Sequence, residues 1–478
     1  MVARQLPRPQ RVLRIWLLVL AAPVAALALG LWLWRQNVPL PYPKDGKPLI
    51  VLTHPGILSY QAEGRYGGTS AGLEHDLAAD FARQLGVPVQ FLEVPRAEIP
   101  ERLARHEAHM AAGWLSASEG FTASASFYET RDVLARVDAA LPISNLENLR
   151  GKTVWANAGT RAWFALEHLR QTLPGLRIEA FHGKLPMDIL EALSNRKIEI
   201  ALVDEALLDI GLNLYPNLDK SLQVGPKHPI HWLFPQDGDP KLVAAASAFI
   251  LESSGNGLIA RLIDRYLGHL ERLSQIDTIV FIERIGSLLP RYRPLFERAQ
   301  LETGIDWRLL AALAYQESQW NPLNTSYTGV RGIMMLTEDT ADFLGVDNRL
   351  DPAQSIPAGA RYLNYLRDQV PATTPEPDRT WQALAAYNIG PGHFSAARKL
   401  AARLGVDGDA WPEMKKILPL LARPAYYSRL KSGKARGGEA VILVENIRVF
   451  YDILTRYEKP YRPKAFNETA KPAADKTT

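Results

Sequence analysis

The spacing of apolar residues predicts two folded regions of different kinds. In residues 48–268, short apolar runs of strand type alternate with stretches in which apolar residues recur at helical spacing. The strand-like runs cover residues 49–53, 87–94, 150–156 and 198–203, and the clearest helical stretch covers 72–86. Because strands and helices alternate, we expect an α/β domain with mainly parallel sheets.

From about Asp277 onward, apolar residues recur at helical spacing in nearly every segment, and Gly and Pro separate the segments. The predicted helices cover 287–303, 307–318, 338–343, 356–369, 380–387, 393–404, 411–421 and 439–457. We therefore expect an all-α domain over residues 269–462. The polar residues 463–478 are expected to form a disordered tail.

The N-terminal residues have the pattern of an export or membrane segment. Residues 1–14 carry four arginines and no acid, and Ile15–Trp34 then runs for twenty residues without a charge. That length is enough to span a bilayer, but Ala26-Leu27-Ala28 is also typical of a signal-peptide cleavage site. We expect residues 1–36 to be a signal peptide or an uncleaved signal anchor that contacts the membrane. Residues 37–47 then form a linker, and the rest of the chain is exported.

Composition and charge exclude several kinds of chemistry. The 478 residues include no cysteine, which excludes disulfides, thiolate metal sites, a cysteine nucleophile and a lipid-modified cysteine. The ten histidines form no His-Glu-x-x-His pair, so a metal site of that type has no support. A nucleic-acid partner requires a clustered basic face, and a net charge of only +4 does not indicate one.

One glutamate lies at the end of an apolar helix face. Asp306 is a suitable N-cap for a helix over 307–318, and Leu310, Leu313 and Glu317 share one face of that helix. A carboxyl group among apolar neighbours has a raised pKa, and a proton donor near neutral pH needs such a pKa. From spacing alone, a solvated glutamate at the last helical turn is the simpler interpretation.

Two further stretches combine glycines with polar or thioether side chains. They are Gly329–Thr337, with Met334 and Met335, and Ala385–Gly392, with Tyr387 and Asn388. Glycines permit tight turns and close approach of a ligand, and Tyr and Asn offer hydrogen bonds that suit sugar hydroxyls and N-acetyl groups. Each stretch alone is also compatible with a structural turn.

Taken in order, Tyr315–Trp320, Gly332–Thr337 and Ala386–Gly390 resemble the motifs of the soluble-lytic-transglycosylase, goose-lysozyme-like superfamily. The resemblance covers about residues 289–457. Met335 stands where most of the superfamily has glutamine, and a membrane-bound branch shares this methionine. Leu443 stands where an aromatic residue is frequent, which affects one pocket wall and leaves the chemistry unchanged.

The upstream region resembles the type 3 extracellular solute-binding domain, which implies a two-lobed α/β fold. The likeness is carried by residues 71–77 and 149–154, and Gly159-Thr160 follows the second of these stretches. Amino-acid binders of this type place an arginine about six residues before a Phe-Ser pair, but here Phe121 precedes Phe127 at that distance. The resemblance makes Asp204 and Thr160 candidate ligand residues. A small muropeptide-like ligand and an empty spacer domain both stay open.

The superfamily resemblance implies a lyase that cleaves the β-1,4 bond between N-acetylmuramic acid and N-acetylglucosamine in peptidoglycan, leaving a 1,6-anhydro end. Glu317 would donate a proton to the leaving oxygen and then accept one from the muramic C6 hydroxyl. By motif match, the residues that orient the glycan would be Ser318, Met334, Tyr387, Asn388 and Gly390. No metal or organic cofactor is implied. Intramolecular attack removes the need for a second carboxylate, and residues 318–337 contain no Asp or Glu.

Two other functions stay open from the sequence. A lysozyme-type hydrolase on the same fold would need a second carboxylate near Glu317. A periplasmic sensor or binding protein would use the helical domain only to grip glycan. In each case the protein is expected in the bacterial cell envelope, facing the periplasm. The resemblance implies peripheral outer-membrane attachment, and an inner-membrane anchor is the alternative.

Overall fold

The computed structural model describes residues 38–62, 70–137, 143–270, 273–326, 329–428 and 433–462. The predicted signal or anchor segment and the predicted disordered tail lie outside the described residues. Within these ranges, the chain forms two compact units. One contains residues 38–62, Ser70–Leu208 and Lys220–Leu262, and the other contains Asp209–Asp219 and the residues from Ile263 onward.

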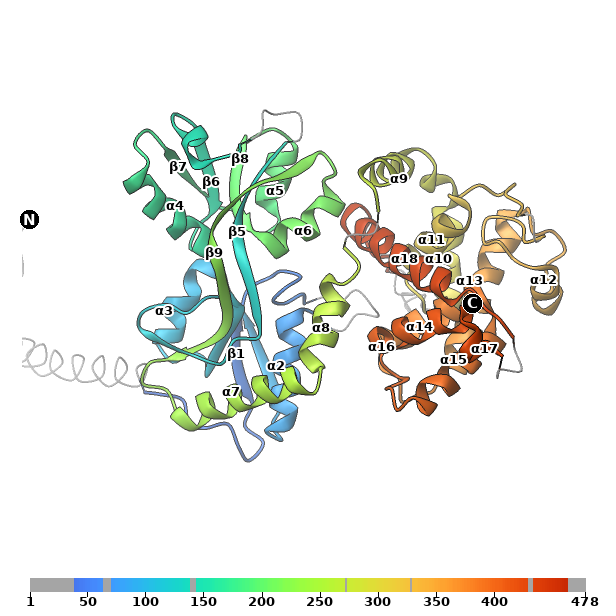
Figure 1. Cartoon of the computed structure of the whole chain (residues 1–478), viewed down its shortest axis with the longest axis horizontal. Coiled ribbons are helices and arrows are strands. Elements are labelled where there is room, and N and C mark those ends of the chain that lie inside the picture. Colours follow the sequence, from blue (N-terminus) through green and yellow to red (C-terminus); the bar gives the residue numbers. More distant parts are fainter. Residues whose placement is uncertain are drawn as a thin grey trace, which may run out of the picture. The chain divides into compact units, whose positions relative to one another are not determined.

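The first unit is built on one mixed β-sheet (Figure 1). Its strands are β1 (Leu49–Thr53), β2 (Val89–Glu93), β3 (Met110–Leu115), β4 (Phe121–Ala123), β5 (Tyr128–Val137), β6 (Thr153–Asn157), β7 (Arg177–Phe181), β8 (Ile200–Asp204) and β9 (Leu218–Pro235). The strand order is β2-β1-β3-β9-β5-β8-β6-β7, with β4 paired to β9.

The four strands predicted from the sequence are confirmed, and each pairs in parallel within its half of the sheet. Val51 lies opposite Phe91 in the β1–β2 pair, and Trp155 lies opposite Ala201 in the β6–β8 pair. The sequence did not predict the long strands β5 and β9, which pair antiparallel with their neighbours β8 and β3 and lie side by side through the middle of the sheet (Figure 1). Glycine, proline and charged residues interrupt the apolar pattern of β9.

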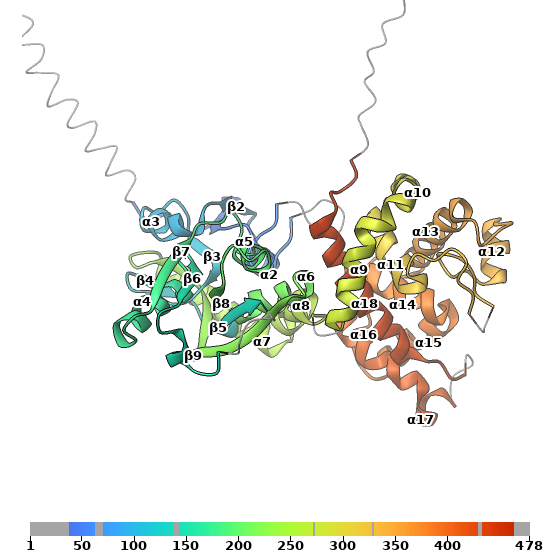
Figure 2. The same ribbon diagram turned by 90° about the horizontal axis from the view of Figure 1, so that it is seen from above.

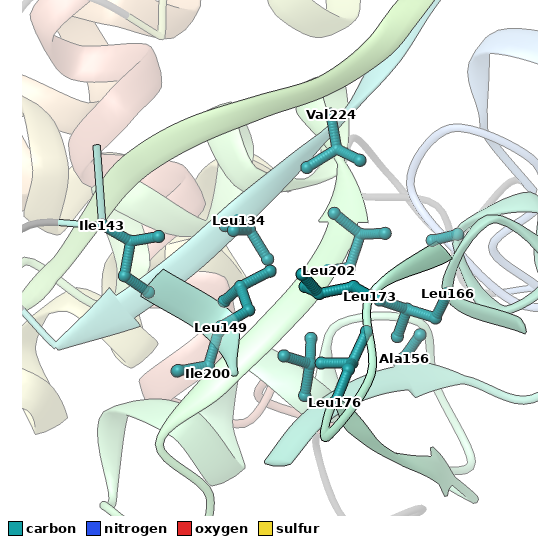
Figure 3. Close-up of a cluster of buried hydrophobic side chains, with 12 residues drawn as sticks. Leu134, Ile143, Leu149, Ala156, Leu166, Leu173, Leu176, Ile200, Leu202 and Val224 are labelled. Carbon is teal, nitrogen blue, oxygen red and sulfur yellow. The ribbon is translucent and has the colours of Figure 1, made fainter. Parts of the chain in front are cut away.

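Helices flank this sheet. They are α2 (Leu73–Gln84), α3 (Ile99–Ala104), α4 (Arg161–Thr172), α5 (Asp188–Ser194) and α7 (Pro240–Gly255), with 3-10 turns η1 (Arg96–Glu98) and η2 (Leu146–Leu149). Two further helices, α6 (Glu205–Leu214) and α8 (Leu258–Leu267), begin in this unit and end in residues that belong to the second. Figure 3 shows the apolar core of one half, where Leu166 of α4 packs with Leu134 of β5 and Leu202 of β8. A second core around Leu52, Leu103 and Leu233 supports the other half. Burial of these side chains stabilises the sheet.

The second unit is helical. Its further elements are α9 (Gln275–Ser287), α10 (Leu289–Thr303), α11 (Trp307–Ser318), α12 (Glu338–Leu344), α13 (Pro352–Gln369), α14 (Asp378–Ile389), α15 (Pro391–Arg403), α16 (Trp411–Ile417), η3 (Leu418–Ala422), α17 (Pro424–Tyr427) and α18 (Gly437–Tyr457). All eight predicted helices have counterparts here. The predicted helix over 411–421 divides at Leu418, because a proline at position 419 disfavours continuation of the α-helix.

The long helix α18 packs against both α11 and α14 (Figure 2). Large aromatic side chains fill the space between the helices, and Trp307, Trp320, Trp381 and Tyr451 are completely or almost completely buried. Buried aromatic rings contribute large apolar areas and favourable tilted or edge-on ring contacts, so this core holds α11 and α14 firmly.

No single helix among the described residues is both long and apolar enough to cross a bilayer. The helices α7 and α8 reach the length and apolar composition of a membrane span only when they are taken together, and the chain bends by 76° between them.

Candidate active site around Glu317

The helix α11 is fixed at its N-terminal end by Asp306. The Asp306 carboxylate accepts a hydrogen bond from the Arg308 amide at 2.9 Å, as an N-cap does, and the Arg308 guanidinium pairs with it at 2.6 Å. The Tyr451 hydroxyl of α18 donates to the same carboxylate at 3.0 Å. Because Leu310 and Leu313 are completely buried, the face that carries Glu317 points into the unit.

The chain turns sharply directly after Glu317 and Ser318. Gln319 and Trp320 both have left-handed backbone conformations, with φ of 53° and 60°. The Trp320 side chain then lies back along the helix, completely buried, and its indole N–H donates to the Ala311 carbonyl at 2.8 Å. This contact fixes the end of α11 and with it the position of Glu317.

The Glu317 carboxyl lies in a poorly solvated environment although the residue as a whole is only half-buried. Burial raises the pKa of Glu317 from 4.5 to about 8. Burial is the only cause of this shift, and no carboxylate among the described residues contributes to it. The structure therefore favours a protonated Glu317 at neutral pH over the solvated glutamate that spacing alone preferred.

The glycine-rich stretch 332–337 lies against the end of α11. The Ser318 side chain is buried, and its hydroxyl contacts the Ala314 carbonyl at 3.0 Å and the Ile333 carbonyl at 2.8 Å. Met334 is completely buried, and a Cβ on Gly359 of α13 would lie 2.6 Å from its Cε. These contacts fix the backbone of the stretch beside Glu317.

Tyr387 connects this stretch to α14. Its hydroxyl donates to the Met334 carbonyl at 2.8 Å. The pKa of Tyr387 is raised well above its ordinary range, mainly because the phenol is buried and also because the charge of Glu317 is close. Asn388 is exposed one residue later, and α14 ends at Gly390, whose φ is 83°. The Tyr387 hydroxyl therefore stays protonated and remains a donor.

The structure brings four of the predicted residues into one network: Glu317 lies near Tyr387, Tyr387 holds Met334, and Ser318 holds the carbonyl of Ile333. Asn388 and Gly390 follow at the end of α14. The sequence pattern singled out Met335 without assigning it a ligand contact. Met335 has a φ of 47° and is half-buried, so it is better placed than Met334 to contact a ligand.

The sequence pattern missed Tyr362, whose ring centroid lies 5.4 Å from that of Tyr387. Tyr362 lies three residues after Gly359 on α13, so the two residues share one face of that helix. Gly359 is the glycine that packs against Met334. A glycine followed at that spacing by an aromatic residue is common in ordinary helix packing, so the sequence alone gave no reason to select it.

In the α/β unit, both candidate ligand residues also cap helices. The Asp204 carboxylate accepts hydrogen bonds from the amides of Ala206 and Leu207 at 3.0 and 3.3 Å, and burial raises its pKa to about 6. The Thr160 hydroxyl donates to the Asn157 carbonyl at 2.7 Å and accepts from the Trp163 amide. Capping accounts for both residue types without a ligand.

A second polar cluster in the same unit was missed by the sequence analysis. Arg96, just after β2, donates to the Gly113 carbonyl at 2.6 Å, to the Trp114 carbonyl at 2.9 Å and to His54 Nε2 at 3.0 Å. Glu74 is completely buried, and burial raises its pKa to about 8. Among the described residues, Arg96 Nε and Glu74 Oε1 are buried without a hydrogen-bond partner.

Comparisons with known proteins match both units. Residues 294–406 match the transglycosylase SLT domain, and residues 49–269 match the bacterial extracellular solute-binding proteins, family 3. The membrane-bound lytic murein transglycosylase F of Methylobacillus flagellatus is 42% identical over 435 residues, 89% of this chain and 91% of that protein. The protein of the same name from Nitrosospira multiformis is 40% identical over 88% of each chain. A solved ancestral arginine-binding protein, bound to arginine, matches 46% of this chain and 98% of its own at 17% identity and a TM-score of 0.42.

Proposed function

Because the chain belongs to the family of membrane-bound lytic murein transglycosylase F, we propose that Glu317 is the catalytic acid and base of its reaction. The protein is a lytic murein transglycosylase that acts on peptidoglycan, and the predicted order of a solute-binding-like α/β domain and a helical SLT domain is confirmed. The functional boundaries that we propose are 48–268 for the first domain and 269–462 for the catalytic domain.

The observation that carries this proposal is the raised pKa of Glu317. A carboxyl group with a pKa of about 8 is mostly protonated at neutral pH and can donate its proton to the glycosidic oxygen as the bond to C1 of the muramic residue breaks. The resulting carboxylate then takes the proton of the C6 hydroxyl while O6 bonds to C1. The products are a free hydroxyl on the leaving sugar and a 1,6-anhydro end, and Glu317 regains its proton without any water being consumed.

The surroundings of Glu317 support one carboxylate acting twice. A hydrolase of lysozyme type needs a second carboxylate to stabilise the cation or to activate water. Among the described residues, no second carboxylate contributes to the pKa of Glu317, whereas the protonated phenol of Tyr387 lies close to Glu317. Attack by the C6 hydroxyl of the same sugar removes the need for that second group through proximity.

We assign the other residues of the network to orientation of the site and the glycan. Ser318 and Tyr387 hold the carbonyls of Ile333 and Met334, so they fix the loop that lines the site. Asn388 is exposed and suits hydrogen bonding to an N-acetyl group, and Gly390 lets the chain leave α14 beside it. Met334 acts through its buried packing and its carbonyl.

The mass of the products tests the proposed reaction. We expect the full-length protein in detergent to release muropeptides from purified peptidoglycan that are one water lighter than those released by a hydrolase. Reducing-end products of full mass would contradict the proposal and would place a second carboxylate near Glu317. Absence of products from a folded protein would favour a glycan-binding function instead.

For the α/β domain we propose a small ligand that carries both a carboxylate and an amine, as the peptide of a muropeptide does. The observation that favours it is the unpartnered Arg96 Nε and Glu74 Oε1. The charges of Glu74, near the start of α2, and of Asp204, at the end of β8, both act on Arg96. Acidic and basic groups therefore lie close together near the ends of strands, where ligands of open α/β sheets bind. Thr160 lies at the helix start that follows β6.

Thermal melting tests this ligand. We expect muropeptides released from peptidoglycan to stabilise the protein by roughly 2.7 kcal/mol at a hundred times their Kd, which raises its Tm. Arg96→Gln is expected to abolish the Tm increase, and Arg150→Gln, at an exposed ion pair, is expected to retain it. No increase with the unmodified protein would identify the domain as a spacer.

The protein is membrane-bound in the cell envelope, as its relatives are by name. We propose that residues 1–36 provide the membrane contact, with peripheral attachment to the outer membrane as the first possibility and an inner-membrane anchor as the second. The enzyme would face the periplasm in both cases. Separation of inner and outer membranes, followed by the N-terminal sequence of the mature protein, distinguishes cleavage from anchoring.

A further inference from the structure

Four aromatic rings form a continuous series that starts beside the catalytic acid. Tyr387, close to Glu317, has its ring centroid 5.4 Å from that of Tyr362. Tyr362 is stacked at 6.3 Å with Tyr365 one helical turn further along α13, and Tyr365 lies 5.6 Å from Phe343 of α12. The series therefore leads from the catalytic site to the surface of α12 and α13.

The two outer rings of this series are exposed. Phe343 is 65% exposed and Tyr365 is 42% exposed, whereas the inner rings of Tyr362 and Tyr387 are half-buried. Neighbouring exposed aromatic rings cost solvation free energy, and such patches on soluble domains commonly mark binding surfaces. The two outer rings contact one another, and each leaves a large part of its surface open to solvent.

The chemistry of the patch fits a neutral sugar. The face of an aromatic ring carries partial negative charge and attracts C–H groups, which cover one face of a pyranose ring. The exposed neighbours of Phe343 on α12 include Asp339 and Asp342, so an anionic ligand is disfavoured. The position of the patch also restricts its ligand. The inner end of the ring series lies beside Glu317, so the ligand of the outer rings is expected to be part of the molecule that Glu317 cleaves.

We propose that Phe343 and Tyr365 form a distal glycan subsite, which binds an N-acetylated sugar ring of the same peptidoglycan strand that Glu317 cleaves. The inference rests on the proposed function of Glu317. A glycan strand bound both at Glu317 and at the distal subsite would contact aromatic rings beyond the bond that is cleaved. The enzyme would then favour long glycan strands over short ones.

The test compares long and short substrates. We expect Phe343→Ala and Tyr365→Ala each to lower kcat/KM on long glycan strands roughly threefold to tenfold, through KM, because one stacked ring contributes about that much. On the shortest strands that the unmodified enzyme cleaves, both variants should match it. Phe343→Tyr keeps a ring and should retain the preference for long strands, and Phe164→Ala, an exposed phenylalanine of the α/β unit, is the control.

Two outcomes would overturn the distal subsite. Unchanged kcat/KM on long strands in the double variant would show that the rings do not contact glycan, and the patch would then be a candidate for protein contacts. Equal losses on long and short strands would show a general disturbance of the catalytic site. Failure of the proposed function is separate, because it would be seen as an absence of anhydro products from the unmodified enzyme.

Discussion

Replacing Glu317 by glutamine is expected to lower the rate of anhydro-product formation by at least about 10³-fold. Glutamine keeps the size and polarity of the side chain, but it can neither donate a proton to the glycosidic oxygen nor accept one from the C6 hydroxyl. Since one group serves both steps, its loss affects both. The measurement is the initial rate of product release from peptidoglycan, with Glu283→Gln on the exposed side of α9 as the matched control.

The pH dependence provides a second readout of the same residue. The reaction starts from the protonated acid, so the rate should be constant below the pKa of Glu317 and should fall about tenfold per pH unit above it, that is above about pH 8. The residual rate of Glu317→Gln should lack this decline. A decline near pH 5 in the unmodified enzyme would contradict the assigned protonation state.

At high pH, Glu317→Gln should stabilise the protein although it removes activity. The folded-state pKa of Glu317 is about 8 and its ordinary value is 4.5, so the folded protein holds a proton that the unfolded chain loses. This contribution to stability is fully present below pH 4.5 and is lost as the pH rises towards 8. Above that window, Glu317→Gln should be more stable than the unmodified protein. An inactive variant that is less stable would indicate damage to the fold instead of lost chemistry.

The sequence predicted the position of Glu317 well because local signals determine it. Asp306 and the Asn321-Pro322 pair mark the ends of α11, and the observed helix has the predicted bounds. The start of α13 was predicted less accurately although its signals are also local: the helix begins at Pro352, four residues before the predicted start, because Asp351 caps it and Pro357 is accommodated inside the helix. Where long-range contacts determine the structure, the sequence offers no such signal.

The same distinction explains the residues that were missed. Arg96 reaches Trp114 and His54 from a position far away in the sequence, and no local pattern connects them. Motif matching selected Met334 as a ligand contact, but only the structure shows that Gly359 encloses its side chain and that Tyr387 uses its carbonyl. The motif match therefore selected residues that lie close together in the structure, but it did not assign each side chain its contact.

The loop beside Glu317 depends on a close backbone contact at Gly332. This residue has a φ of 87°, and a Cβ on it would lie 1.8 Å from the Arg349 carbonyl oxygen. The Arg349 side chain also donates to the carbonyls of Gly329 and Leu336 at 3.0 and 3.1 Å, so the loop closes around this arginine. A side chain at 332 must displace this backbone and with it the Ile333 carbonyl that Ser318 holds.

Gly332→Ala is therefore expected to destabilise the catalytic unit by about 3 kcal/mol, of which about 1 kcal/mol is backbone strain and the rest is the steric conflict with Arg349. Activity should fall about 10²-fold because the loop moves relative to Glu317. Gly329→Ala is the matched control: its φ is 80°, but no atom lies within 4 Å of the added Cβ, so only the strain remains. Denaturant unfolding and product release measure the two effects. Equal losses in both variants would show that backbone conformation, and not the contact with Arg349, determines the loop.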